Sequence, residues 1–253
     1  MAELIALAFI AMAGLSTILG ALPLVVVRKL SHRSHDTVLG YVAGIMLGVA
    51  VLGLILHVGG GSGAQVDVMA VSTVLGGLVI VSLMGAMRRI PLPMPFVKNG
   101  DRNGTSIAFL IFLSLAIHNA PEGLATGVGY SQGLTSLGHS IAISIAFQNI
   151  PEGLLVATAV MGETGSRRAG VGYAVLSALV EPVVGFAAFF ALALSPAAVV
   201  AASGFAAGAM LFVVFFQIIP ESHRHGYHWA ATVALMAGLA TSVAIDLILG
   251  TVA

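Results

Sequence analysis

The sequence contains no cysteine and very little charge. Without cysteine the chain cannot form a disulfide scaffold or a thiolate metal centre, which leaves histidine, carboxylate, amide and thioether groups as candidate metal ligands. Only 8% of the 253 residues are charged, about a third of the fraction found in soluble globular domains. The formal net charge is zero, and no large basic patch indicates nucleic-acid binding. These features exclude an ordinary water-soluble domain.

Apolar residues make up 58% of the chain and fall in long runs. A bilayer core takes about 20 apolar residues per helical span, so the length accommodates eight spans joined by short loops. The first run is too long for a signal peptide and has no basic segment before it, so we expect it to be retained. We predict an all-α polytopic membrane protein, a single transmembrane domain over 1–253, with helices at about 4–27, 37–57, 68–87, 105–130, 136–161, 169–194, 197–220 and 229–252.

The basic residues lie on alternate loops. All ten Lys and Arg residues fall in the first, third, fifth and seventh of the predicted loops, and the other three loops contain none. Because cytoplasmic loops carry the excess of basic residues, this pattern predicts that both termini lie on the outer face of the cell membrane. The third loop, 88–103, is predicted to be a cytoplasmic linker. The basic residues are Arg28, Lys29, Arg33, Arg88, Arg89, Lys98, Arg102, Arg167, Arg168 and Arg224.

A short motif recurs in two helices of opposite predicted direction. Residues 43–47 read Ala-Gly-Ile-Met-Leu and residues 207–211 read Ala-Gly-Ala-Met-Leu. A motif shared by the second and seventh helices indicates an inverted repeat, in which helices 1–3 and 6–8 are two copies around a central pair. Inverted repeats commonly support alternating access to a site at the middle of the membrane. We therefore predict a 3+2+3 arrangement.

A second repeat lies in the central pair of helices. His118-Asn119-Ala120-Pro121-Glu122-Gly123-Leu124 and Gln148-Asn149-Ile150-Pro151-Glu152-Gly153-Leu154 share the pattern Asn-x-Pro-Glu-Gly-Leu. Residues four apart share one helix face, so His118 lies with Glu122 and Gln148 with Glu152. An ionised carboxylate in the middle of a span is costly unless it meets a cation, a partner or water. The two faces can therefore enclose one ion.

These residue types suit a divalent transition metal. Imidazole, carboxylate and amide groups form a mixed nitrogen and oxygen set that fits Zn²⁺, Fe²⁺, Mn²⁺ or Co²⁺. Glu181 in the sixth helix adds another carboxylate, and Met46 in the second adds a soft sulfur. A single Pro-Glu-Gly motif can be only a structural kink, but two matched copies favour function. Met46 also lies on a stripe of glycines that favours close helix packing, which is an equally ordinary role for methionine.

With these motifs the sequence resembles the ZIP (Zrt/Irt-like) metal transporters, and the motif pair resembles the GufA-type branch. The resemblance covers essentially the whole chain. It implies a first metal position lined by Met46, His118, Glu122, Gln148 and Glu152, and a second lined by Asn119, Asn149, Glu152 and Glu181. Some relatives have Asp at the position of Asn149, so the second position here has less charge. The third loop lacks the His-rich tract common in the family.

The resemblance implies transport of a divalent metal toward the cytoplasm by alternating access, with Zn²⁺ favoured over Fe²⁺, Mn²⁺ and Cd²⁺. The metal is the cargo, no catalytic cofactor is expected, membrane lipid surrounds the protein, and the glycine stripes permit a homodimer. Two alternatives stay open: a metal-selective channel and an intramembrane metalloenzyme, although the zinc-protease motif His-Glu-x-x-His is absent. His223, His225 and His228 gather near Glu221 and fit equally a metal-receiving patch or a solvated loop.

Overall fold

The fold is described from a computed structural model that places residues 1–25, 30–59, 63–87, 102–193 and 195–251. Every regular element in these residues is helical, which confirms the prediction of an all-helical chain. The long helices are α1 (Ala2–Ala21), α2 (His32–Gly48), α4 (Gly63–Met87), α5 (Arg102–Tyr130), α6 (Ser136–Thr164), α7 (Arg167–Leu192), α8 (Pro196–Val213) and α10 (His228–Ile248). The short elements are η1 (Leu22–Val25), η2 (Val49–Leu56), α3 (His57–Gly59), η3 (Val214–Ile218) and α9 (Ile219–Ser222).

Two of the long helices continue through a π-helical stretch. The π-helix η2 and then α3 extend α2 as far as Gly59, and the π-helix η3 and then α9 extend α8 as far as Ser222. These stretches lie in the second and seventh predicted helices, which also carry the first repeated motif. π-helical turns within α-helices occur frequently at functional sites.

Hydroxyl side chains cap the helices that follow short turns. Thr135 accepts a hydrogen bond from the N–H of Gly138 at the start of α6, and Ser166 accepts one from the N–H of Ala169 at the start of α7. Such caps satisfy N–H groups that have no partner within the helix. Gly165 ends α6 at a φ of 65°, a left-handed conformation that favours glycine. The α6–α7 connection is therefore short and brings the two helices back antiparallel.

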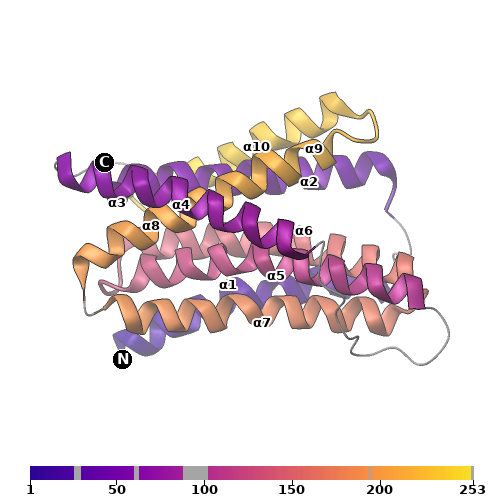
Figure 1. Cartoon of the computed structure of the whole chain (residues 1–253), viewed down its shortest axis with the longest axis horizontal. Helices are drawn as coiled ribbons and strands as arrows, with labels where there is room; N and C mark the ends of the chain where they lie inside the picture. The colour runs from indigo at the N-terminus through magenta and orange to yellow at the C-terminus, as the bar shows by residue number, and fades with distance from the viewer. Residues whose placement is uncertain (26–29, 60–62, 88–101, 194, 252–253) are drawn as a thin grey trace.

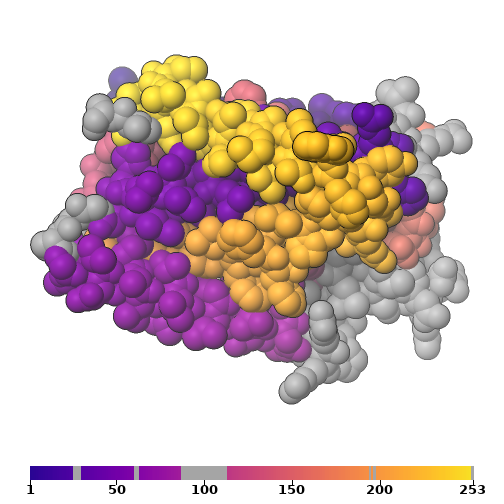
Figure 2. All heavy atoms as spheres, turned by 90° about the horizontal axis from the view of Figure 1, so that it is seen from above, coloured from indigo at the N-terminus to yellow at the C-terminus, as the bar shows by residue number. Residues whose placement is uncertain are grey.

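Among the described residues, seven helical segments are long and apolar enough to cross a membrane: Ala2–Leu24, His32–Gly59, Gly63–Ala86, Ser136–Thr164, Arg167–Leu192, Ala198–Ser222 and His228–Ile248. Large apolar side chains on the outside of α4 and α10 are exposed, including Val71, Val74, Val233 and Met236. Figure 2 views a face of the molecule covered largely by α4, α8 and α10. An exposed apolar surface of this kind fits contact with lipid and a multi-pass membrane protein.

The helices pack in two groups. One group, the four-helix bundle, consists of α1, α5, α6 and α7, in which α1 packs on α6 and α7 and α5 packs on the same two helices. The other group, the helix row, runs in the order α10, α2, α8 and α4. The helices of both groups lie roughly along the long axis of the molecule (Figure 1). Between the groups, α5 contacts α8 and α6 contacts α2.

Glycine allows the closest helix approaches, and these lie within each group. A Cβ added to Gly153 on α6 would lie 1.9 Å from the Thr17 carbonyl oxygen on α1. In the helix row, a Cβ on Gly208 of α8 would lie 1.8 Å from the Thr73 carbonyl oxygen on α4. Small residues of this kind let helix backbones meet in membranes. Each group is therefore tightly packed within itself.

An apolar core fills one half of the space between the groups. Its side chains include several that follow Met46 along the continuous helix α2–η2–α3, several that follow Glu122 along α5, and several that precede Gln148 along α6. They lie toward the end of the molecule at which α1 begins and α10 ends, called here the terminal end (Figure 1). The core residues on these three helices include Val49, Ala50, Leu54, Ala125, Val128, Ile141 and Ile145.

The opposite end carries basic residues and is called the basic end. Arg33, Arg167, Arg168 and Arg224 all lie in the first turn of a helix or in the turn before one at this end. The predicted linker over 88–103 falls on 88–101, outside the described residues, apart from 102 and 103, with which α5 begins. The helix predicted at 37–57 begins earlier, at His32, because Ser31 caps it by accepting a hydrogen bond from the N–H of Ser34.

Candidate functional site

The two matched motifs meet where α5 packs against α6. Pro121 and Pro151 lie inside these helices, where each removes one backbone N–H and leaves a carbonyl without its usual donor. Gln148 donates a hydrogen bond of 2.7 Å from Nε2 to Glu122 Oε1, although the residues belong to different copies of the motif. The repeated sequence thus places polar groups of both helices in direct contact.

The polar atoms of this region are buried and incompletely bonded. His118, Glu122 and Gln148 are buried, with Glu122 fully inaccessible. Both ring nitrogens of His118 lack a hydrogen-bond partner, as do Glu122 Oε2 and Gln148 Oε1. Leaving a buried polar atom unsatisfied costs about 1–3 kcal/mol. Several such atoms from two helices therefore point to a polar or ionic ligand.

A cavity of about 110 Å³ lies between the two helix groups at this point. The four-helix bundle contributes His118, Glu122 and Glu152 to its wall, with apolar side chains of the same helices. The helix row contributes Met46 and, farther toward the basic end, Gln217 and Glu221. The cavity therefore links the buried carboxylates to the basic end of the molecule, whereas the apolar core fills the side toward the terminal end.

The position of Met46 is compatible with both roles considered from the sequence, packing between helices and contact with a metal. Its side chain is buried in the apolar core, and it also lines the cavity with His118 and Glu122. The π-helix η2 begins at Val49, one turn beyond it. Packing and contact with a cavity ligand are thus compatible at this position.

Two further polar contacts lie inside the four-helix bundle, one between Asn149 and Glu181 and one between Asn119 and Ser177. Asn149 Nδ2 lies 2.8 Å from both carboxylate oxygens of Glu181 and from the Ala13 carbonyl oxygen. Asn119 donates to Ser177 Oγ at 2.8 Å and to the Ser177 carbonyl oxygen at 3.0 Å. The Oδ1 atoms of both asparagines have no partner. These amides hold the region where α5 and α6 meet α7.

One polar cluster is not predictable from the sequence pattern. His35, Asp36 and His225 have ligand atoms within 4.8 Å of one another, and they are the one such group of three His, Asp or Glu residues found in the described ranges. His118, Glu122 and Glu152 line a common cavity without meeting this distance. The sequence His-x-x-His-Asp at 32–36 is a local pattern of possible metal ligands. The third residue of the cluster, His225, lies in a different predicted loop, so the sequence pattern does not connect it with Asp36.

Comparisons with known proteins agree on one family. The profile of the ZIP zinc transporters matches residues 98–246, which include both Pro-Glu-Gly motifs. The chain is 35% identical to the zinc transporter GufA of Myxococcus xanthus over 94% of this chain and 96% of that protein. It is 36% identical to the zinc transporter ZIPB of Bordetella bronchiseptica, over 93% of this chain and 78% of that protein. It is 31% identical to the zinc transporter ZupT of Akkermansia muciniphila, over 90% of this chain and 91% of that protein.

Proposed function

The chain belongs to the ZIP family of zinc transporters, and we propose that it carries Zn²⁺ or a similar divalent metal through the cavity between its two helix groups. The family is one of transporters, so neither a catalytic cofactor nor an intramembrane enzyme activity is part of this proposal. The observation that carries the location is the set of unpartnered polar atoms on His118, Glu122 and Gln148 beside the cavity. Two carboxylates and an imidazole there neutralise and bind a dication.

Met46, His118, Glu122, Gln148 and Glu152 are the proposed ligands of the first metal position. Glu152 and Glu122 supply two negative charges, and His118 supplies a nitrogen with no competing hydrogen bond. For Gln148 to bind, its free Oε1 would turn toward the ion while Nε2 keeps its hydrogen bond to Glu122. The proposed second position uses Asn119, Asn149, Glu152 and Glu181, where the unpartnered amide oxygens are the available neutral ligands.

The proposed topology has eight spans in a 3+2+3 inverted repeat. Seven of these spans are the apolar segments described above, and α5 is proposed as the additional one. This 29-residue helix carries His118, Asn119 and Glu122. In this repeat α1, α2 and α4 correspond to α7, α8 and α10, and α5 corresponds to α6. Helix contacts support it, because the contact of α2 with α10 corresponds to that of α8 with α4, and the contact of α1 with α6 corresponds to that of α7 with α5. Matched glycines make these contacts, since Gly44 meets Leu235 and Gly208 meets Thr73.

We place the basic end in the cytoplasm and both chain termini on the outer side of the cell membrane, following the positive-inside rule. The cavity then connects the metal position to the cytoplasm, and the apolar core separates it from the outside. One-sided access of this kind supports a carrier with alternating access over an open metal-selective channel. The glycine contacts lie within each helix group, so rocking of one group against the other would leave them intact.

The test is Zn²⁺ uptake by proteoliposomes that contain the full chain. We expect Glu122→Ala and Glu152→Ala each to abolish nearly all uptake, because either change removes a charge that faces the dication. Glu163→Ala is the matched control, since Glu163 lies exposed near the end of α6. Insertion is checked by protein content and by elution as a single species in detergent. Wild-type uptake by either of the first two variants would refute the proposed site.

A further inference from the structure

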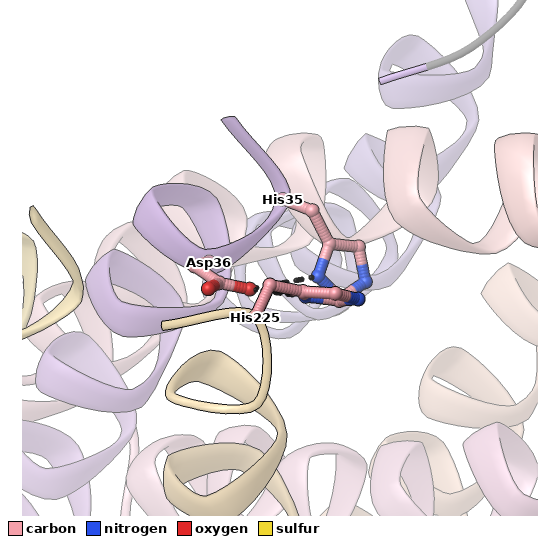
Figure 3. A group of neighbouring side chains, drawn as sticks. All are labelled: His35, Asp36 and His225. Atoms are coloured by element: carbon pink, nitrogen blue, oxygen red, sulfur yellow. Dashed lines mark hydrogen bonds and ion pairs between the residues drawn. The ribbon is translucent and has the colours of Figure 1, made fainter. Parts of the chain in front are cut away.

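Two histidines and an aspartate meet at the basic end of the helix row, and none of the three lines the cavity. His35 and Asp36 lie in the first turns of α2, and His225 lies in the turn between α9 and α10. Both histidine rings approach the same carboxylate, as Figure 3 shows. Asp36 and His225 are 189 residues apart in the chain, so the fold alone brings them together.

The spacing of the ligand atoms suits a small divalent metal. Asp36 Oδ1 lies 2.7 Å from His225 Nδ1 and 3.5 Å from His35 Nδ1. Two ligand atoms on one tetrahedral zinc ion lie about 3.3 Å apart, given zinc–nitrogen distances near 2.0–2.1 Å. An ion could therefore take the place of the imidazole protons after small side-chain rotations. Three protein ligands leave a fourth position for water or another side chain.

Asp36 carries an unmet bonding requirement. Its side chain is 0% exposed, and its second carboxylate oxygen, Oδ2, has no hydrogen-bond partner. A carboxylate that served only to receive hydrogen bonds from the two histidines would leave this buried oxygen unsatisfied, which is costly. A metal ion supplies the positive charge that a fully buried carboxylate lacks. The histidines are partly open, at 30% exposure for His35 and 24% for His225, so an ion can reach them.

His32 extends the cluster. Its ring stacks on that of His225 with the ring centroids 4.2 Å apart. It lies one helical turn before Asp36 on the same face of α2. A rotation of this ring would offer another nitrogen to an ion held by the other three residues.

The cluster lies just beyond the mouth of the proposed transport cavity. Leu39, which lines the cavity, is one turn after Asp36 on α2. Glu221 also lines the cavity and shortly precedes His225 in the chain. An ion that leaves the cavity toward the basic end would thus pass the cluster.

We propose that His35, Asp36 and His225 form a separate binding site for Zn²⁺ or a similar divalent metal. Metal in this site joins the start of α2 to the α9–α10 turn and so fastens two segments of the helix row. The idea that the site binds metal released from the cavity rests on the proposed transport function. The capacity of the site to bind metal is independent of that function.

The experiment measures Zn²⁺ binding to the purified full chain in detergent by competition with a chromophoric chelator. The background is the double variant Glu122→Ala and Glu152→Ala, which removes the proposed transport site. We expect this background to retain zinc binding, and the further changes His35→Gln and His225→Gln to weaken it on the order of 100-fold. His57→Gln in the same background is the control, because His57 lies in α3, at the other end of the continuous helix α2–η2–α3 that begins with His32.

Absence of zinc binding in the background, or its persistence after both histidines are replaced, would overturn the proposal. A loss caused by His57→Gln or His223→Gln that equals the loss from His225→Gln would also overturn it. The wild-type chain gives a measurement that needs no variant: Zn²⁺ should slow the modification of His35 and His225 by diethyl pyrocarbonate, relative to His57, as read by peptide mass spectrometry. Equal modification rates with and without Zn²⁺ contradict the site. Uptake assays on Glu122 and Glu152 variants test the transport function separately.

Discussion

Gln148 and Glu122 are joined by a hydrogen bond of 2.7 Å that connects the two copies of the Pro-Glu-Gly motif across α5 and α6. The bond uses one polar atom of each side chain and leaves the other, Gln148 Oε1 and Glu122 Oε2, without a partner. The amide thus orients the carboxylate while each residue keeps one oxygen without a partner, and these are the oxygens that we propose as metal ligands. Orientation of a ligand by a neighbouring hydrogen bond is a general feature of metal sites.

Replacement of Gln148 by leucine should reduce Zn²⁺ uptake by about 10–100-fold, because the change removes both a ligand oxygen and the donor that orients Glu122. The measurement is initial uptake into proteoliposomes over a range of zinc concentrations. Gln132→Leu serves as the control, since Gln132 lies exposed in the turn between α5 and α6. Equal effects of the two substitutions would show that the hydrogen bond has no part in transport.

The absence of cysteine makes one-sided access directly measurable. Leu39 on α2 lines the cavity, whereas Ala50 on η2, which continues α2, is fully buried in the apolar core. A cysteine at position 39 should react with a membrane-impermeant thiol reagent added from the cytoplasmic side, and a cysteine at position 50 should react from neither side in this conformation. Labelling is read by mass shift in oriented vesicles. Rapid reaction of Ala50→Cys from the outer side would favour a channel.

The site motifs could be predicted from the sequence because their spacing is local. Helical periodicity alone puts His118 with Glu122 and Gln148 with Glu152, and the structure has these residues buried on facing helices. The all-helical fold followed from the same kind of information, since long apolar runs with so little charge have few alternatives. The ligand roles themselves are still predictions.

Other features depend on contacts between distant segments or on polar first turns. The predicted second helix began where apolar residues begin, but the Ser31 cap adds the polar turn that contains His32, His35 and Asp36. Asp36 then contacts His225, and no periodicity links the two. The π-helices η2 and η3 likewise have no evident signal in the residues that form them. The cavity follows from how the two helix groups meet, which a single helix pattern cannot specify.

The tight contact of α1 with α6 predicts a large difference between two glycines of one helix. Alanine at Gly153 would place its Cβ against the Thr17 carbonyl oxygen, so we expect destabilisation of about 1–3 kcal/mol or a shift of the helices. Alanine at Gly162, also on α6, meets no atom within 4 Å and should stabilise the helix by roughly 0.5–1 kcal/mol. Thermal unfolding in detergent distinguishes the variants. Similar melting temperatures would contradict the close approach of α1 and α6.

Zinc uptake should decrease as the medium changes from neutral to mildly acidic pH. Metal binds the deprotonated forms of its ligands, and removing a carboxylate from water disfavours its ionised form. Protons therefore compete with the ion at the two buried glutamates, Glu122 and Glu152, and acid lowers the apparent affinity for zinc. Uptake is measured at several pH values with an ionophore present, so that no proton gradient contributes. The competition should raise the zinc concentration for half-maximal uptake more than it lowers the maximal rate. Unchanged uptake across this range would mean that the ligands bind metal without releasing protons, which is incompatible with the proposed set.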